Sequence, residues 1–413
     1  MNVLIRIAAA ALVLAARGPV ARADVVTDWN STVITVTTGG SAYPQFRALA
    51  AMHAAIHDAV NAVEHRYKPY AADLEAPAGT SVDAAVATAA HDVLVGLVPA
   101  QKAAIDAALA ASLTKAGGGK ATDDGAAVGR QIAAGVLAMC ASDGFTAKVE
   151  VKPAAAAPAV WQLTPGWAAP ILTQWGQMRP MVIKKLSDFD VGPPPSPASE
   201  RFAKDYAEVK AVGARNSAAR TADQTAAAIF WTTQVMVPWN MAAQAASRAR
   251  NLSVVENARL FALLNMAAFD SGIVTMEQKY RYNHWRPYNA IRAQAGLQNV
   301  ALTSDPSWEP LLVTPGHPDY PSGHCITSGA AAQVLRDFFQ DDHVELSFTY
   351  PSLFGVTRSW KSFTEIQKEV ENARVWGGIH FRTADENGTL VGRKIGQYVV
   401  KNTLLPANRA AAN

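Results

Sequence analysis

Three short segments near the end of the 413-residue chain concentrate residues that could bind and activate an anion. Residues 279–287 read KYRYNHWRP, residues 317–324 read HPDYPSGH, and residues 374–380 read RVWGGIH. Lysine and arginine supply positive charge, and histidine can gain or lose a proton near neutral pH. These residue types predict a site for a small oxyanion.

The first segment places two cations at helical spacing. Lys279 and Arg286 are seven residues apart, about two helical turns, so both could project from one helix face. Two such cations repel each other unless an anion lies between them. A solvated basic helix end is the simpler interpretation of this pair taken alone.

The second segment predicts a tight turn that leads into a helix over residues 325–339. Free amides and the positive end of the helix dipole favour an anion there. Ser322 adds a hydroxyl donor, Gly323 lets the backbone approach closely, and His324 can carry a proton. Taken alone, the segment could equally be an ordinary helix cap with a chance histidine.

The third segment ends one helix and begins another. The glycines at 377 and 378 should stop the preceding helix and swing His380 back toward Arg374. A following helix is expected to start at Thr383, with Glu386 closing a capping box. Glycine pairs often only end helices, so this segment is weak support by itself.

In order and spacing, the segments form the pattern Lys-x6-Arg-Pro, Pro-Ser-Gly-His and Arg-x5-His. This pattern resembles the vanadium-dependent haloperoxidases, above all bacterial ones, and the related type 2 phosphatidic acid phosphatase superfamily. Similarity extends over residues 265–392, and more faintly through 175–176 to residues 53–61. The resemblance implies a vanadate cofactor held by Lys279, Arg286, Arg374, Ser322 and the Gly323 amide, with His380 as the axial vanadium ligand and His324 as the acid–base group.

The resemblance implies peroxide chemistry. Hydrogen peroxide would be activated on vanadium, with Lys279 polarising it, and would oxidise a halide that then reacts with a small organic acceptor. The alternative is an acid phosphatase, in which His380 attacks a phosphate ester to form a phosphohistidine and His324 protonates the leaving alcohol. Phosphate and vanadate share charge and geometry, so the same residues would suit both.

Three positions bear on that choice. The phosphatases usually have serine before the motif arginine and aspartate four residues after the nucleophilic histidine; here these are Ala373 and Ala384, with Asp385 one residue later. Both differences disfavour the phosphatase and leave the partner of His380 unidentified. His317 is similar to the histidine of bromoperoxidases, which favours bromide or iodide, although a hydrogen-bonded loop histidine is an equal alternative.

Other residues suggest weaker hypotheses. Asp270 is a candidate carboxylate partner for one of the cations, or else a helical surface charge. His53 and His57, with Asp58 adjacent, could belong to a divalent-metal hydrolase, or could be buried histidines of the helical core. A non-enzymatic protein that binds or stores an oxyanion is also conceivable, but simple binding needs no axial histidine or proton shuttle.

Periodicity predicts an all-α protein, with the oxyanion site in the core of a helical bundle. Helices are expected over 43–64, 82–115 and 121–142, with a break at the glycines 117–119, and strand-like alternation is confined to 33–37. Capping boxes are expected at Thr221, Ser253 and Ser362. The predicted organisation is a signal peptide at 1–23, an N-terminal helical region at 24–150, a Pro/Trp-rich irregular connection at 151–200 and the oxyanion-binding bundle at 201–405.

The composition and the start of the chain limit which partners and which cellular compartment are expected for this protein. The start of the chain resembles a secretory signal cleaved before Asp24, which predicts a periplasmic or secreted protein. Removing its three arginines from the 37 basic residues leaves a balance with the 34 acidic ones, so there is no electrostatic reason to expect nucleic acid or an anionic membrane as a partner. No segment after the signal is expected to be long and apolar enough to cross a membrane, so no stable membrane insertion is expected. Relatives associate through helices, which allows a homo-oligomer. Cys140 and Cys325 could pair or remain free thiols.

Overall fold

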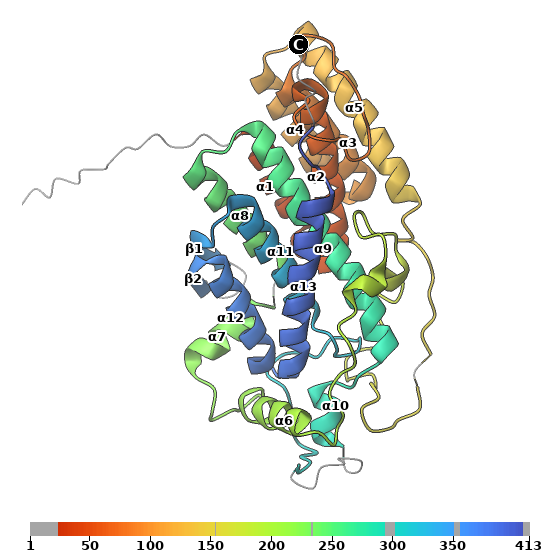
Figure 1. The fold of residues 1–413 in the computed structure, drawn as a ribbon, viewed down its shortest axis with the longest axis vertical. Helices are drawn as coiled ribbons and strands as arrows, with labels where there is room; N and C mark the ends of the chain where they lie inside the picture. Colours follow the sequence, from red (N-terminus) through yellow and green to blue (C-terminus); the bar gives the residue numbers. More distant parts are fainter. Residues whose placement is uncertain (1–23, 153, 233, 294–301, 351–355, 408–413) are drawn as a thin grey trace, which may run out of the picture.

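Thirteen α-helices and one two-stranded sheet make up the regular structure of the described residues, apart from three short 3-10 turns (Figure 1). The computed structural model describes residues 24–152, 154–232, 234–293, 302–350 and 356–407. The all-α prediction is therefore confirmed, with one small hairpin added. The predicted signal peptide at 1–23 lies outside the described residues.

The N-terminal region consists of five helices: α1 Val25–Thr37, α2 Ala42–Glu64, α3 Val82–Leu97, α4 Lys102–Ala116 and α5 Lys120–Ala141. The expected helix over 43–64 is confirmed as α2. The expected helix over 82–115 is instead two, α3 and α4, which meet at an angle of 119° around the turn Pro99–Gln101 because proline cannot continue a helix. The glycines at 117–119 all have positive φ and separate α4 from α5, as expected.

The prediction of strand-like structure at 33–37 is wrong, because these residues form the last turns of α1. Val26, Trp29, Val33 and Val36 recur at helical spacing and are buried against neighbouring helices. The threonine hydroxyls that produce the alternation, such as that of Thr37, donate to carbonyl oxygens one turn earlier. Tertiary burial therefore overrides the β propensity of this segment.

The true strands are β1 His343–Tyr350 and β2 Val356–Ser362, an antiparallel hairpin that was not anticipated. Leu346 pairs with Trp360, and both are buried against the main core. Inward-facing residues alternate with exposed ones along β2, which is the period of a half-buried strand. This alternation is visible in the sequence and was the signal from which β2 could have been predicted.

Residues 151–200 have almost no regular structure, as predicted, apart from short turns at Trp175–Gln177 and Leu186–Phe189. The connection nevertheless packs closely. Trp175 is fully buried against Tyr43 and Phe269, with edge-on ring contacts at 4.9 and 5.6 Å between centroids.

The following helices are α6 Glu200–Val212, α7 Ala222–Phe230, α8 Met236–Arg250, α9 Val254–Tyr282 and the short α10 Pro287–Arg292. The reciprocal capping boxes predicted at Thr221 and Ser253 are confirmed at the starts of α7 and α9. Each box satisfies two backbone amides that a helix start leaves without partners.

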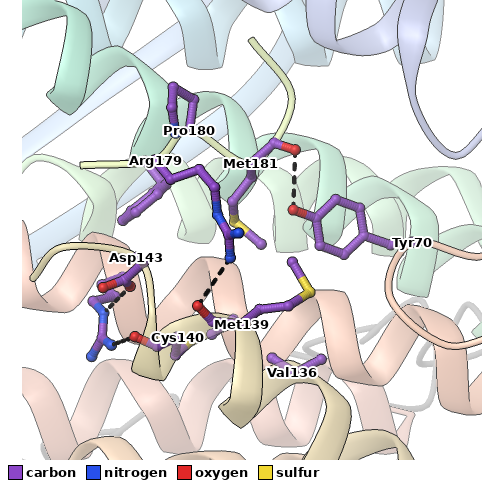
Figure 2. Close-up of a pocket in the computed structure, with 11 residues that line it drawn as sticks. Tyr70, Val136, Met139, Cys140, Asp143, Arg179, Pro180 and Met181 are labelled. Atoms are coloured by element: carbon purple, nitrogen blue, oxygen red, sulfur yellow. Dashed lines mark hydrogen bonds and ion pairs between the residues drawn. The ribbon is translucent and has the colours of Figure 1, made fainter. Parts of the chain in front are cut away.

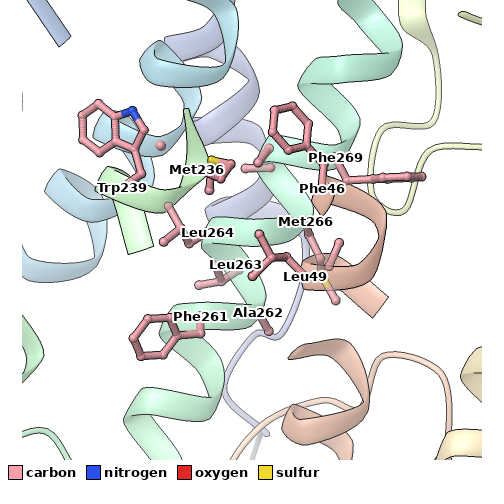
Figure 3. Packing of buried hydrophobic residues seen from close by; sticks show 14 of the residues in the cluster. Phe46, Leu49, Met236, Trp239, Phe261, Ala262, Leu263, Leu264, Met266 and Phe269 are labelled. Atoms are coloured by element: carbon pink, nitrogen blue, oxygen red, sulfur yellow. The ribbon is translucent and has the colours of Figure 1, made fainter. Parts of the chain in front are cut away.

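Helix α9 forms the centre of the molecule (Figures 1 and 3). Phe261, Leu263, Leu264 and Met266 point in different directions around it, and all are fully buried. A helix that is apolar all round requires burial on every side. It is also the one single helix in the described ranges that is long and apolar enough to cross a membrane, contrary to the expectation that no such segment follows the signal, and 94% of its apolar window is buried inside the protein.

The last helices are α11 Gly323–Phe339, α12 Phe363–Trp376 and α13 Arg382–Asn402. The expected cap at Ser362 is confirmed, but only half of the box forms, because Glu365 accepts from the Lys361 amide instead. The box expected at Thr383 is wrong. Helix α13 begins at Arg382, and Glu386 pairs with Arg201.

Glycines let α11 and α13 pack backbone against backbone. A Cβ atom on Gly392 would lie 2.0 Å from the Ile326 carbonyl oxygen, and one on Gly329 would lie 2.5 Å from the Thr389 carbonyl oxygen. These obstacles are main-chain atoms, which cannot rotate away. The start of α11 is thereby held rigidly against α13.

A buried polar network joins α1, α2, α8 and α9. Asn30 donates to Asn240 at 2.8 Å, Asn240 exchanges hydrogen bonds with Asn265, and the Asn30 amide nitrogen lies 2.9 Å from His53 Nε2. All four side chains are fully buried. Burial lowers the pKa of His53 to about 3, so this histidine is a neutral member of the core.

Gly392→Ala should destabilise the protein by roughly 1–3 kcal/mol, because the added methyl group must push α11 and α13 apart. The measurement is urea unfolding. Gly135→Ala is the matched control: nothing lies within 4 Å of its Cβ position in α5, so alanine should raise stability by up to about 1 kcal/mol. Equal effects of the two substitutions would contradict the close packing of α11 on α13.

His53 should make stability sensitive to acid. Its folded pKa of about 3 lies below the unfolded value of about 6.5, so the unfolded chain binds the proton more readily and stability falls as the pH drops below 6.5. The contribution is about 2 kcal/mol at pH 5. His53→Gln should flatten the pH dependence between 7 and 5 by that amount, whereas His343→Gln, at an exposed position, should not. Identical slopes for wild type and His53→Gln would refute this.

Candidate active site

The three sequence segments meet where four helix ends converge. Lys279 lies in the last turn of α9, Arg286 is the residue before α10, Ser322 precedes α11, and Arg374 lies in the last turn of α12. The expectation that Lys279 and Arg286 share one helix face is wrong, because α9 ends at Tyr282 and Asn283 turns the chain with φ of 47°. The two cations reach the same site from different elements.

All three cations are buried, and each is held by main-chain carbonyl groups. Lys279 Nζ donates to Pro318 O and Asp319 O at 2.8 and 2.7 Å. Arg286 Nη1 donates to Ile379 O at 2.6 Å, and Arg374 Nη1 donates to Trp231 O at 2.6 Å. Carbonyl groups carry only partial charge, so they compensate the buried cations incompletely.

The protonation equilibria reflect this excess of positive charge. Burial, together with repulsion from Arg286, holds the pKa of Lys279 well below its usual value. Burial lowers the pKa of Arg286 to about 10, and Arg374 adds to this while Asp319 opposes it. Burial also lowers the pKa of Arg374. A bound anion would reverse each of these shifts.

The start of α11 forms the floor of the site. Ser322 is fully buried, and Gly323 is the first residue of the helix, where amides lack partners within the helix. A Cβ atom on Gly323 would lie 3.1 Å from Tyr43 Oη and 3.2 Å from Thr275 Cγ2, so glycine leaves the space that these side chains need. This is the predicted geometry for anion binding at a helix start.

Three histidines line one cavity together with Arg374 and Gly323. The cavity has a volume of about 80 Å³, and His317, His324 and His380 all contribute to its wall. It has room for one small tetrahedral anion or about two or three water molecules. The glycine pair lets His380 return toward Arg374 as expected: Gly378 has φ of 74°, and the Ile379 amide donates to Arg374 O at 3.3 Å.

Burial, with added repulsion from nearby cations, holds the pKa values of His317 and His380 well below the ordinary value. Both rings are therefore neutral at pH 7 and can offer a nitrogen lone pair. His317 Nδ1 lies 3.0 Å from Arg286 Nη2, and His380 Nε2 lies 3.1 Å from Arg286 Nη1. Arginine can only donate, so it contacts lone pairs.

Asp319 belongs to the site, although the sequence pattern assigned it no role. Its Oδ1 lies 2.8 Å from His380 Nδ1 and 3.7 Å from Arg286 Nη1, and the side chain is fully buried. Burial opposes its ionisation, but His380, His284 and Arg286 together hold its pKa well below the usual range. The one sequence signal that could have pointed to Asp319 was its position inside the second motif, residues 317–324.

The donors fit a vanadate ion. Arg374 Nε and the Ser322 hydroxyl are buried and have no well-aligned hydrogen-bond partner within the described ranges. Such groups are costly unless a ligand satisfies them. Three cations, a hydroxyl, a free helix amide and a neutral histidine around a cavity of this size match a trigonally disposed, multiply charged oxyanion.

The roles considered for Asp270 are wrong. It is neither a surface charge nor a partner of the cations. Its buried carboxylate accepts the consecutive amides of Met181, Val182 and Ile183 at 2.7–2.8 Å, and it thereby anchors the irregular connection. Burial raises its pKa to about 6 against the effect of these bonds. Asp385 lies in the first turn of α13, as expected, but it is buried and accepts from the Cys325 thiol at 3.3 Å.

The metal hydrolase hypothesis finds no support. Asp58 accepts the amides of Tyr70, Ala71 and Ala72 and lies 3.1 Å from His57 Nδ1. No group of three His, Cys, Asp or Glu side chains with metal-binding geometry occurs in the part of the chain that the structure describes. Asp58 therefore anchors a loop, and His53 and His57 are core residues.

A separate pocket lies between α2, α5 and residues 179–181 (Figure 2). Its cavity of about 30 Å³ has room for about one water molecule. Arg179 donates to Met139 O at 3.2 Å, so its charge is already engaged. Cys140, which lines this pocket, and the buried Cys325 are both free thiols.

Comparison with known proteins agrees with this geometry. Residues 259–408 match the family described as the VCPO second helical-bundle domain. A stretch of 92 residues is 32% identical to the vanadium chloroperoxidase of Curvularia inaequalis, covering 20% of this chain and 14% of that protein. The alignment thus spans only a small part of this curated relative.

Solved structures extend the likeness to the whole fold. A bacterial vanadium-dependent iodoperoxidase aligns with a TM-score of 0.81 at 24% identity, over 94% of this chain and 99% of the other. The apo form of a bacterial vanadium-dependent chloroperoxidase aligns with a TM-score of 0.72 at 15% identity, over 87% and 94%. The expected resemblance is confirmed: residues 259–408 match the VCPO second helical-bundle domain, and the chain has the fold of the bacterial vanadium-dependent iodoperoxidase and chloroperoxidase.

Proposed function

We propose that this protein is a vanadium-dependent haloperoxidase, which uses hydrogen peroxide to oxidise a halide. The observation that carries the proposal is a cavity lined by Arg374 together with His317, His324 and His380. Two more buried cations belong to the same site: Arg286 contacts His317 and His380, and Lys279 donates to the carbonyl groups of the loop before α11. Their charges are incompletely compensated by the protein, so the site requires a bound anion. Neutral histidine at the cavity wall adds a ligand that simple electrostatic binding would not need.

The residues have distinct roles in this proposal. Lys279, Arg286 and Arg374 neutralise the anion oxygens, while Ser322 and the Gly323 amide donate further hydrogen bonds. His380 would offer a ring nitrogen to the bound vanadate. His324, at the start of α11, holds and returns the proton of the incoming peroxide. When bound, vanadate supplies the Lewis acidity that activates hydrogen peroxide.

We propose bromide or iodide as the halide. His317 lines the cavity, and its ring is fixed by the contact with Arg286 Nη2 at 3.0 Å. A neutral imidazole fixed there narrows the cavity without adding negative charge, which would repel a halide. The similarity of this position to bromoperoxidases supports the choice, as does the iodoperoxidase among the structural neighbours. We also propose that a small organic acceptor reacts with the oxidised halide. The same proposal includes export of the chain, with cleavage of the signal before Asp24, and assembly into a homo-oligomer.

An acid phosphatase acting through a phosphohistidine is the second candidate. One observation favours it: a carboxylate does approach His380 Nδ1, although it comes from Asp319 and not from position 384. An oriented, neutral histidine is what an attack on phosphorus requires. Ala373 still departs from the phosphatase pattern.

Protein purified without phosphate and then loaded with orthovanadate should oxidise bromide and iodide with hydrogen peroxide faster than chloride. Inorganic phosphate should compete with vanadate, because both anions fit the same cavity. The assay is bromination of an acceptor dye, run beside hydrolysis of a phosphate ester. Hydrolysis by the vanadate-free protein without any bromination would reject the proposal and favour the phosphatase.

His324→Ala separates an enzyme from a protein that only binds the anion. Turnover should fall on the order of 10²–10⁴-fold, because the proton transfer loses its acid–base group. Vanadate affinity should change little, since the three cations remain. The measurements are the halide oxidation rate and vanadate binding by equilibrium dialysis, and unchanged turnover would remove His324 from the mechanism.

A further inference from the structure

His380 must present Nε2 to the anion, so something has to determine the tautomer and direction of its ring. Asp319 reaches the other ring nitrogen from the loop before α11, with Oδ1 2.8 Å from Nδ1. We propose that Asp319 is the positioning residue of His380 and keeps the proton on Nδ1. The inference rests on the proposed function, in which His380 contacts the anion.

Contacts at both ring nitrogens select the same tautomer. Arg286 Nη1, which can only donate, lies closer to Nε2, at 3.1 Å, than to Nδ1, at 3.4 Å, and this favours the lone pair on Nε2. The ionised Asp319 carboxylate is only an acceptor, so Nδ1 carries the proton. The ring N–H is not aligned well enough with Oδ1 for a linear hydrogen bond. The tautomer therefore follows from the types of the two neighbours as well as from their distances.

Asp319 is itself held firmly. Its amide donates to His284 O at 2.9 Å, and its carbonyl oxygen accepts from Lys279 Nζ at 2.7 Å. The carboxylate also lies 3.7 Å from Arg286 Nη1 and 3.8 Å from His284 Nδ1. One residue thus links the loop before α11 to His380 and to two of the three cations.

Asp385 is the competing candidate, because the phosphatases place their orienting aspartate near this position. Here its Oδ1 accepts from the Cys325 thiol, and burial raises its pKa well above the usual value. A carboxyl group that accepts from a thiol, and whose ionisation burial disfavours, is poorly suited to fix an imidazole. Asp385 is therefore a matched control, since it is an equally buried aspartate close to the same cations.

The first measurement is the tautomer of His380 in the vanadate-free wild type, from long-range nitrogen–proton correlations of the histidine-labelled protein, with His380→Gln assigning the signal. The proton should reside on Nδ1. This test needs no variant of Asp319 to fold, and a proton on Nε2 would overturn the proposal.

The second measurement compares Asp319→Asn with Asp385→Asn. The asparagine amide can donate to Nδ1, so Asp319→Asn should move the proton toward Nε2 and lower vanadate and phosphate affinity about 10–100-fold. Binding is followed by vanadium NMR and by competition with phosphate. Asp385→Asn should leave the tautomer unchanged. A tautomer that responds to Asp385→Asn and not to Asp319→Asn would overturn the proposal.

These readouts separate the two proposals. If the wild type brominates but Asp319→Asn leaves the tautomer of His380 unchanged, the haloperoxidase function stands and the role of Asp319 is rejected. Wild type that only hydrolyses phosphate esters, with the expected tautomer change, would reject the haloperoxidase function and keep Asp319 as the positioning residue of His380.

Discussion

The burial of three cationic side chains at one site is the constraint on which the rest of this structure depends. Lys279 and Arg286 are fully buried and Arg374 nearly so, and main-chain carbonyl groups are their main partners. Removing such charges from water is costly unless opposite charge compensates them. Within the described ranges the carboxylate of Asp319 supplies only part of that charge. The site is therefore built to favour an anion.

The scaffold holds these cations by bringing helix ends together. The site residues lie at the ends of α9, α10, α11 and α12, and helix termini are the places where backbone groups remain free for a ligand. The start of α11, which lines the cavity, is held by the close packing of α11 on α13 through glycine. Rigidity of this kind keeps like charges close together, which a flexible site would not do.

Buried carboxylates in this protein have two different uses. Asp58 and Asp270 each accept a run of three backbone amides and anchor irregular stretches of chain, so their hydrogen-bonding capacity is taken up by the fold. Asp319 instead faces His380 and Arg286, which belong to the cavity. The distinction between structural and functional aspartates thus lies in what each carboxylate contacts, since burial is common to all three.

The sequence by itself determined the helical class and, through the resemblance of its three motifs, predicted the cations and histidines that the structure brings together. These follow from periodicity and from motifs whose residues lie close together along the chain. Only the tertiary structure decided that Lys279 and Arg286 come from different elements, that 33–37 is helical, and that Asp270 anchors a loop. It also placed Asp319 beside His380. The physical reason is that burial and side-chain partners arise from contacts between segments far apart in the chain, which local spacing does not encode.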